Sequence, residues 1–237
     1  MITIAHIEND YKEKFGIPRQ PGLVPALSRI VFEPAYRREE ALRGLEGYSH
    51  LWLLWQFSED FASRGPKEGR AADAEVWSPT VRPPRLGGNT RVGIFATRSP
   101  NRPNPIGLSS VKLIRVEQDP HLGPVLWVEG ADLMDGTPIY DVKPYVPYTD
   151  CHPEATGGFA AEHLHDTLQV DFPADRLEQV PSEKRQALLE ILRQDPRPSY
   201  QENPKLVYGL TYGTQNVQFT VSEGTVHVTA VEDRLDQ

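Results

Sequence analysis

The 237-residue chain lacks the features on which disulfide-rich, secreted and membrane-spanning proteins depend. Its one cysteine, Cys151, excludes an intramolecular disulfide framework and a cysteine-based zinc ribbon. The longest apolar run, residues 51–55, is far too short to span a bilayer, so we expect no membrane partner. The first residues carry neither a basic region nor a small-residue cleavage site. We therefore expect no secretory signal and a cytoplasmic location.

Common catalytic signatures are missing as well. The chain has no G-x-G-x-x-G, G-x-x-x-x-G-K-[ST], G-x-S-x-G or H-E-x-x-H motif. Their absence argues against a Rossmann enzyme, a P-loop NTPase, a serine hydrolase with that elbow and a zincin. His163 and His165 are alternate residues of a polar segment with no evident third ligand. We therefore expect no metal.

Turn-forming residues are abundant and define the expected fold. The 22 prolines and 18 glycines favour extended segments and turns over a helical bundle. The almost continuously apolar segment 50–57 predicts a strand buried on both faces, and residues 36–43 predict a short helix. The other strands expected in the first part of the chain are 1–8, 26–34, 91–98, 108–116 and 125–128.

The pattern changes after residue 150. Apolar periodicity disappears, so we interpret residues 1–150 as one domain, 151–166 as a linker and 167–237 as a small second domain. The second domain should contain a strand at 168–172, a helix at 182–194 capped by Ser182, and a three-strand meander at 206–211, 217–221 and 226–231. The expected fold class is mainly β with some α (α+β).

The charge is unevenly distributed. The whole chain carries −8, but residues 81–115 contain no Asp or Glu and carry seven basic residues, which leaves −15 for the remainder. A basic segment on an acidic protein predicts a local anion-binding site. Its basic residues are Arg82, Arg85, Arg91, Arg98, Arg102, Lys112 and Arg115.

Two proline-stiffened loops hold four of these arginines. Arg82 and Arg85 are three residues apart, so an extended polyproline backbone would project both from one edge. Arg98 and Arg102 stand in a loop with three prolines, whose side chains have little conformational freedom. Such arginines suit bidentate recognition of a carboxylate, a phosphate or a base edge. The alternative is a rigid surface turn with solvated arginines.

Carboxylates cluster around residues 132–141. Asp132, Asp135 and Asp141 could hold ribose hydroxyls, a cationic ligand or a proton in transfer. Asp135 precedes Gly136, so a plain turn with a local cap at Asp132 is an equally valid interpretation.

The segment after the expected helix provides a further candidate. Prolines flank Arg197, and Tyr200 follows it; a fixed arginine beside an aromatic ring can clamp a phosphate and a base. The alternative is a simple helix stop at residues 195–196.

Several of these motifs together resemble those of the TsaA-like TrmO family. The resemblance spans the N-terminus to about residue 200, and the run 81–107 is the most specific part of it. The segment 61–74 is longer than is usual in the family, and Ser199 replaces a more frequent Ala. The remaining motifs are residues 11–15, 18–21, 49–52, 132–138, 141–145 and 195–200.

The family resemblance implies a fold and an activity. It implies an N-terminal β-barrel that binds S-adenosyl-L-methionine (AdoMet), a small C-terminal domain and a homodimer. The implied reaction is methylation of N(6) of threonylcarbamoyladenosine at position 37 of threonine tRNA. A non-catalytic adenosyl-sensing or RNA-binding barrel remains an alternative, and a phosphoester-processing enzyme is a weaker one because no metal site is evident.

The resemblance also implies roles for single residues. Asp195 is the first candidate to accept the proton, Arg197 or Arg102 could pair with the threonyl carboxylate, and Tyr200 completes the catalytic set. We expect Arg82, Arg85 and Arg102 to bind substrate. The implied cofactor contacts are Pro18, Arg19, Gln20, Ser58, Glu59, Arg98, Leu108, Asp132, Leu133, Met134 and Asp135.

Overall fold

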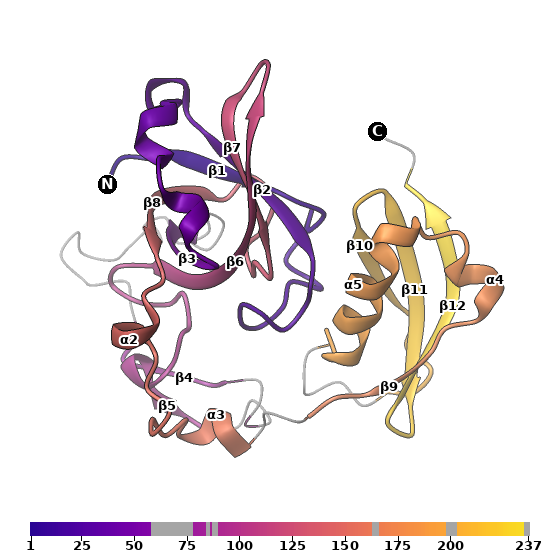
Figure 1. Cartoon of the computed structure of the whole chain (residues 1–237). Helices are drawn as coiled ribbons and strands as arrows, with labels where there is room; N and C mark the ends of the chain where they lie inside the picture. Colours follow the sequence, from indigo (N-terminus) through magenta and orange to yellow (C-terminus); the bar gives the residue numbers. More distant parts are fainter. Residues whose placement is uncertain (58–77, 84–85, 87–89, 163–165, 198–202, 235–237) are drawn as a thin grey trace, which may run out of the picture.

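The chain folds into two units, each built on its own β-sheet (Figure 1). The computed structural model describes residues 1–57, 78–83, 86, 90–162, 166–197 and 203–234. Strands form most of the regular structure, and α5 (Ser182–Arg193) is the longest helix in these ranges. The expected mainly β, α+β fold class is confirmed.

Six antiparallel strands of the N-terminal unit pair in a closed barrel, in the order β1-β2-β7-β6-β3-β8. Both neighbours of every strand belong to this ring, so none of the six has a free edge. The strands are β1 (Ala5–Glu8), β2 (Leu27–Phe32), β3 (His50–Gln56), β6 (Ile106–Asp119), β7 (Gly123–Glu129) and β8 (Pro138–Pro144).

Alternating burial along the strands explains how the barrel forms its core. In β3, Leu51, Leu53 and Trp55 are buried, whereas the residues between them are half-exposed. The expectation that this apolar strand is buried on both faces was therefore wrong. A closed sheet has only one inner face, so a strand within it buries every second side chain.

Two expected elements of the N-terminal unit are different in the structure. Residues 36–43 do not form a helix; the region contains short 3-10 turns at Pro34–Tyr36, Glu39–Leu42 and Leu45–Gly47. None of their residues is fully buried, and only Leu42 and Leu45 pack against the barrel core, so few apolar contacts are available to stabilise a longer helix. The expected strand 91–98 is reduced to β5 (Val92–Gly93), paired with β4 (Thr80–Val81), and a 3-10 turn at Ile94–Ala96 follows.

The C-terminal unit is a four-stranded sheet, in the order β10-β11-β12-β9, with α5 beside it. The expected meander is confirmed as β10 (Tyr208–Tyr212), β11 (Gln215–Ser222) and β12 (Thr225–Asp233). The preceding strand β9 (Gln169–Asp171) pairs with β12 in parallel.

Ser182 is not the cap of α5: Pro181 holds the N-cap position, and no side chain caps the helix there. Short helices within the described residues are α2 (Pro147–Asp150), α3 (Phe159–Glu162) and α4 (Ala174–Leu177).

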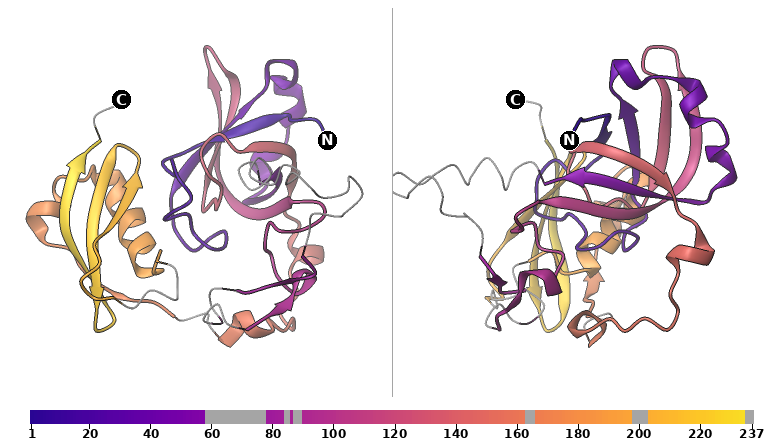
Figure 2. Two further views of the ribbon diagram at one scale, coloured as in Figure 1. Left: turned by 180° about the vertical axis from the view of Figure 1, so that it is seen from behind. Right: turned by 90° about the vertical axis from the view of Figure 1, so that its left-hand side faces the viewer.

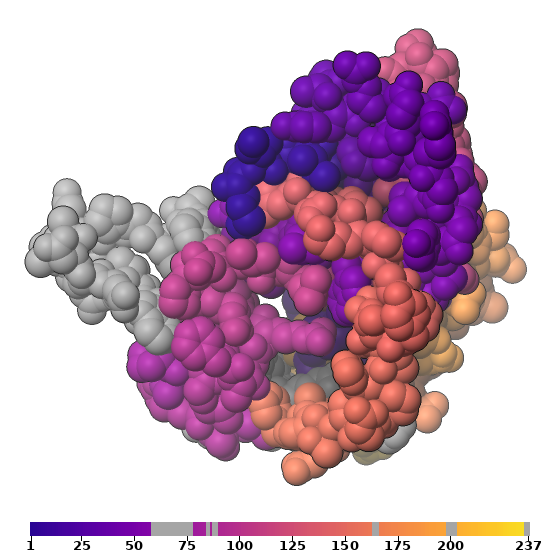
Figure 3. Space-filling view, turned by 60° about the vertical axis from the view of Figure 1, so that its left-hand side comes forward, coloured from indigo at the N-terminus to yellow at the C-terminus, as the bar shows by residue number. Residues whose placement is uncertain are grey.

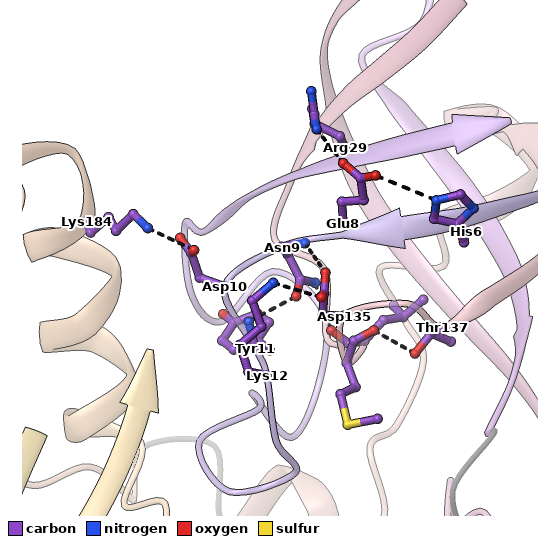
Figure 4. A network of polar contacts seen from close by, with 12 residues as sticks. His6, Glu8, Asn9, Asp10, Tyr11, Lys12, Arg29, Asp135, Thr137 and Lys184 are labelled. Carbon is purple, nitrogen blue, oxygen red and sulfur yellow. Dashed lines mark hydrogen bonds and ion pairs between the residues drawn. The ribbon is translucent and has the colours of Figure 1, made fainter. Parts of the chain in front are cut away.

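The loop between β1 and β2, residues 9–26, joins the two units. Tyr11, Val24 and Ala26 are buried in the same hydrophobic core as α5 and the C-terminal sheet. Asp10 forms an ion pair of 2.8 Å with Lys184 of α5, which Figure 4 shows at close range. Figures 1 and 2 show this β1–β2 loop, in indigo, between the barrel and the C-terminal unit. A segment near the N-terminus is thus part of the C-terminal core.

Within the described ranges, no helix is long and apolar enough to cross a membrane.

Gly16 offers a test of the contact between the β1–β2 loop and the C-terminal unit. A Cβ at Gly16 would lie 2.2 Å from Cδ1 of the buried Leu210, and the backbone has φ +94°. Gly44 has a similar φ of +89° but nothing within 4 Å. We expect Gly16→Ala to lower the free energy of unfolding by about 1–3 kcal/mol more than Gly44→Ala, because only Gly16 adds overpacking.

Urea denaturation of both variants and the wild-type protein measures this difference. Both substitutions carry the cost of a left-handed residue with a Cβ, so their difference isolates the clash. Equal losses in the two variants would contradict the close packing of the loop on Leu210.

Candidate functional site

A cavity of about 520 Å³ lies where the β1–β2 loop meets the barrel. This volume is within the range of about 300–1,000 Å³ that is usual for small-molecule sites. The loop, strands β3 and β6, the chain after β5 and the segment before β8 all contribute walls. Figure 3 shows residues 90–107, in magenta, on the same face as the chain after α2, in orange. The lining residues are Lys14, Ile17, Pro18, Arg19, Gln20, Trp55, Phe57, Thr97, Arg98, Pro100, Arg102, Ile106, Gly107, Leu108, Asp132, Met134 and Thr137.

Trp55 forms an apolar wall whose position depends on Gly107. The two residues are register partners on β3 and β6. A Cβ on Gly107 would lie 2.1 Å from the Trp55 ring, so glycine is what allows the indole to lie across β6. The indole also packs on Phe57, with ring centroids 4.2 Å apart.

A hydrogen-bond chain runs from Trp55 to a buried carboxylate in the cavity. Trp55 Nε1 donates to Ser109 Oγ at 3.0 Å, and Ser109 Oγ donates to Asp132 Oδ1 at 2.5 Å. Burial raises the pKa of Asp132 from 3.8 to about 6, although the Ser109 hydrogen bond and the charge of Arg98 act in the opposite direction. The site therefore holds a carboxyl group that changes its charge near pH 6.

Two arginines of the proline-rich loop carry positive charge to the cavity. Arg98 Nη1 donates to Gln20 Oε1 at 2.7 Å, which links this loop to the β1–β2 loop. Arg102 Nη1 donates to the carbonyl oxygen of Thr97 at 2.6 Å, and its guanidinium lies 5.4 Å from the Phe95 ring centroid. The loop thus presents both cations in fixed positions.

Most of the expected cofactor contacts line this one cavity, and two described ones do not. Leu133 is fully buried in the barrel core. Asp135 accepts hydrogen bonds from the backbone N–H of Asn9 at 2.8 Å and from Lys12 Nζ at 2.7 Å, as Figure 4 shows. Asp135 therefore fixes the start of the β1–β2 loop. The expected contacts that do line the cavity are Pro18, Arg19, Gln20, Arg98, Leu108, Asp132 and Met134. Ser58 and Glu59 lie outside the described residues.

The turn after α5 lies beside the cavity. The Asp195 carboxylate holds the Arg197 guanidinium with two hydrogen bonds, of 2.8 Å from Nε and 2.9 Å from Nη2. Arg197 also lies over the Tyr208 ring, 6.0 Å from its centroid. Arg19, on the cavity wall, donates to the carbonyl oxygen of Asp195 at 2.9 Å. Tyr200 lies outside the described residues.

The basic segment 81–115 does not form one uniform surface. Lys112 pairs with Glu129 at 3.2 Å, and Arg115 pairs with Glu117 at 2.7 Å. Acidic residues outside the segment thus neutralise the positive charges of Lys112 and Arg115. Arg82 is exposed, and Arg91 Nη1 donates to Thr80 Oγ1 at 2.7 Å. Arg85 lies outside the described residues.

Several residues that line the cavity were not predicted from the sequence. Trp55 lies in the segment 50–57 that was expected to be a buried strand, and it is both buried and part of the cavity wall. The signal that could have identified it is the glycine between Ile106 and Leu108, since a glycine inside a strand marks a close approach. Arg102 was assigned to substrate, and it lines the same cavity as Arg98. The other lining residues that were missed are Lys14, Ile17, Phe57, Thr97, Pro100, Ile106 and Thr137.

The described residues contain no group of three or more His, Cys, Asp or Glu that could hold a metal ion. His163 and His165 lie outside them.

The fold and the site define a two-unit α+β protein with a ligand cavity beside the junction of its units. A family model of the tRNA-methyltransferase O N-terminal domain matches residues 6–151, and one of the TrmO C-terminal domain matches residues 165–234. The chain therefore belongs to the TrmO family.

Individual relatives match nearly the whole chain. A tRNA (adenine(37)-N6)-methyltransferase of Escherichia coli (strain K12) is 41% identical over 243 residues, which cover 98% of this chain and 97% of the relative. A protein of the same name from Eikenella corrodens is 42% identical and covers 78% of this chain and 97% of its own length. The crystal structure of TrmO from Pseudomonas aeruginosa superposes with a TM-score of 0.72 at 32% identity, covering 97% of both chains.

The raised pKa of Asp132 predicts a specific pH dependence of stability. Its pKa is about 6 in the folded protein against the ordinary aspartate value of 3.8, so the stability it contributes is complete below pH 3.8 and lost as the pH rises through 6. Asp132→Asn cannot ionise. Between pH 4 and 7.5 we expect the variant to gain up to about 3 kcal/mol of unfolding free energy relative to the wild-type protein.

Urea unfolding of the two proteins across this pH range measures the effect. Asp175→Asn, at an exposed position, serves as the matched control and should follow the wild-type curve. Parallel curves for the wild-type protein and Asp132→Asn would show that burial does not hold the Asp132 carboxyl in its neutral form.

Proposed function

We propose that this protein transfers the methyl group of AdoMet to N6 of adenine 37 in tRNA. The observation that carries the proposal is the proximity of two candidate sites. Arg19 lines the cavity and donates a hydrogen bond to the turn that holds Asp195 and Arg197. Its family membership and the names of its relatives support the same reaction.

The residues of the cavity fit AdoMet chemically. Arg19 and Arg98 offer cations for the methionine carboxylate, and Asp132 offers a buried anion for the positively charged part of the ligand. Trp55 and Phe57 offer apolar surface for a flat base. When bound, AdoMet supplies an activated methyl group on its sulfonium. The protein's task is then to orient the acceptor and to exclude water.

The turn after α5 is the proposed acceptor side. We propose that Arg197 pairs with the carboxylate of a threonylcarbamoyl group, because its guanidinium is fixed and only 14% of its side chain is exposed. This assignment makes threonylcarbamoyladenosine the substrate nucleoside and threonine isoacceptors the substrate tRNAs. Tyr200 remains part of the proposed catalytic set.

The role of Asp195 follows from its pairing. Both of its carboxylate oxygens accept hydrogen bonds from Arg197, so the carboxylate is engaged in holding that guanidinium. We therefore favour a positioning role for Asp195, holding Arg197 toward the acceptor, over direct proton transfer. The leaving proton then passes to another acceptor or to water.

Charge and assembly complete the proposal. Arg82, Arg85 and Arg102 are proposed to bind tRNA, with the contact confined to one face of an acidic chain. A homodimer, which the family resemblance implies, is also part of the proposal. We propose residues 1–150 and 167–237 as domains, 151–166 as their linker, and a cytoplasmic location.

A methyl-transfer assay tests the function directly. Purified protein is incubated with radiolabelled AdoMet and threonine tRNA that carries threonylcarbamoyladenosine without the methyl group. Label on that nucleoside, and none on tRNA with unmodified adenine 37, is the expected result. AdoMet binding without any transfer would instead favour a non-catalytic sensor.

Two variants separate the possible roles of Asp195. If Asp195 positions Arg197, Asp195→Asn should raise KM for tRNA about tenfold and leave the shape of the pH profile of kcat unchanged, because an amide still accepts one of the hydrogen bonds. Arg197→Lys should raise KM for tRNA at least as much, since lysine lacks the planar fork. AdoMet affinity, measured by calorimetry, should be unchanged in both variants.

Steady-state kinetics from pH 5.5 to 9 make this measurement. The disappearance of the acidic limb of the kcat profile in Asp195→Asn would identify Asp195 as the proton acceptor instead. Loss of AdoMet binding in Arg197→Lys would place Arg197 in the cofactor cavity.

A further inference from the structure

Arg19 touches two parts of the molecule that belong to different units. Its side chain lines the cavity from the β1–β2 loop. Its guanidinium Nη2 also donates to the backbone carbonyl oxygen of Asp195 at 2.9 Å and to that of Arg197 at 3.5 Å. These carbonyls stand on either side of Pro196, in the turn that directly follows α5.

This turn needs an external support. Asp195 has φ +48°, a left-handed conformation that residues with a side chain rarely adopt. Its backbone N–H bonds to the carbonyl oxygen of Leu192 at 3.2 Å, which belongs to the helix end. Within the turn, the Arg197 N–H donates to Asp195 Oδ1 at 3.3 Å. From outside the turn, Arg19 donates to the carbonyls of Asp195 and Arg197, so it adds a second support for the conformation that orients Arg197.

Building on the proposed function, we propose that Arg19 is a positioning residue that couples cofactor binding to tRNA binding. A ligand that fills the cavity contacts the Arg19 side chain and restricts its rotamers. It also excludes water from the hydrogen bonds to the turn, which are exposed in the ligand-free protein. Both effects stabilise the turn that presents Arg197, so the cofactor raises the affinity for tRNA.

Thermodynamic linkage makes the coupling reciprocal. If the cofactor tightens tRNA binding by some factor, tRNA must tighten cofactor binding by the same factor. The effect is therefore measurable from both sides and without any methyl transfer.

The packing of the two units does not depend on Arg19. The β1–β2 loop is fixed to the C-terminal unit by the Asp10–Lys184 ion pair, by the buried Tyr11 and by a hydrogen bond of 2.9 Å from the Gly213 N–H to the carbonyl oxygen of Asp10. A substitution of the exposed Arg19 should leave these contacts in place. Its effect on coupling can thus be separated from an effect on folding.

The length of the side chain explains why an arginine is required at position 19. Both hydrogen bonds come from Nη2, the outermost atom of the guanidinium, whereas a lysine side chain ends one bond short of that position. Arg19→Lys therefore keeps the charge near the cavity and removes the paired contact with the turn.

The experiment compares tRNA affinity with and without S-adenosylhomocysteine, which fills an AdoMet site and cannot donate a methyl group. Fluorescence anisotropy gives the Kd of labelled threonine tRNA for the wild-type protein, Arg19→Lys and Arg185→Lys. Arg185 is a matched control: it donates to the carbonyls of Val180 and Glu178 at 2.8 and 3.1 Å and does not line the cavity. The thermal midpoint of each variant confirms that it is folded.

In the wild-type protein and Arg185→Lys, we expect saturating S-adenosylhomocysteine to lower the Kd for tRNA about fivefold or more, within the usual range of allosteric coupling. In Arg19→Lys the ratio should fall to about one, and tRNA binding without the ligand should also weaken, since the turn has lost its support. Calorimetry of S-adenosylhomocysteine with and without tRNA should return the same factors.

A wild-type ratio of one, or an unchanged ratio in Arg19→Lys, would overturn the coupling. So would an Arg19→Lys variant that loses S-adenosylhomocysteine but binds tRNA as the wild-type protein does, because Arg19 would then serve the cofactor alone. Coupling without methyl transfer in the wild-type protein would support the role of Arg19 and contradict the proposed function, so the two failures are distinguishable.

Discussion

The structure depends on the packing of one loop into a core that belongs to another part of the chain. Residues 9–26 leave the barrel after β1 and return at β2, and in between they bury Tyr11, Val24 and Ala26 against α5 and the C-terminal sheet. The same loop supplies Pro18, Arg19 and Gln20 to the cavity. Because apolar burial is the dominant stabilising term in folding, the C-terminal unit determines where these cavity residues lie. The two units therefore build the site together.

The cavity concentrates opposite charges in an apolar surrounding. Asp132 is buried against Ser109 and Trp55, and Arg98 and Arg102 approach from a proline-stiffened loop. Fixed groups of this kind stabilise a charged ligand without the reorganisation that water would require. Such preorganisation suits an enzyme that holds a reactive, charged cofactor and relies on alignment.

Local sequence patterns predicted much of this protein, and long-range packing explains the rest. The meander β10-β11-β12 follows from residue periodicity, and the proline and arginine spacing pointed to the cavity through Arg98. The continuous apolar run of β3 predicted the strand itself but not its alternating burial, which depends on closure of the sheet. The wall at Trp55 depends on its register with Gly107, and the neutralisation of Lys112 depends on Glu129 of a neighbouring strand. Strand pairing determines such contacts, and no local pattern reveals which strands will be neighbours. Short 3-10 turns stand where a helix was expected, in a region where only Leu42 and Leu45 pack against the barrel core.

The strand order of the C-terminal sheet has a consequence for biosynthesis. β12 lies between β11 and β9 although it is the last of the four strands in the chain. The sheet therefore cannot be completed until residue 233 has left the ribosome, and β9 must wait for a partner more than fifty residues downstream. During that interval the barrel can close, but the apolar side chains of the β1–β2 loop have no core to enter. The nascent chain thus exposes an apolar segment beside an incomplete cavity. Exposed apolar segments of this kind are prone to aggregation and are bound by chaperones.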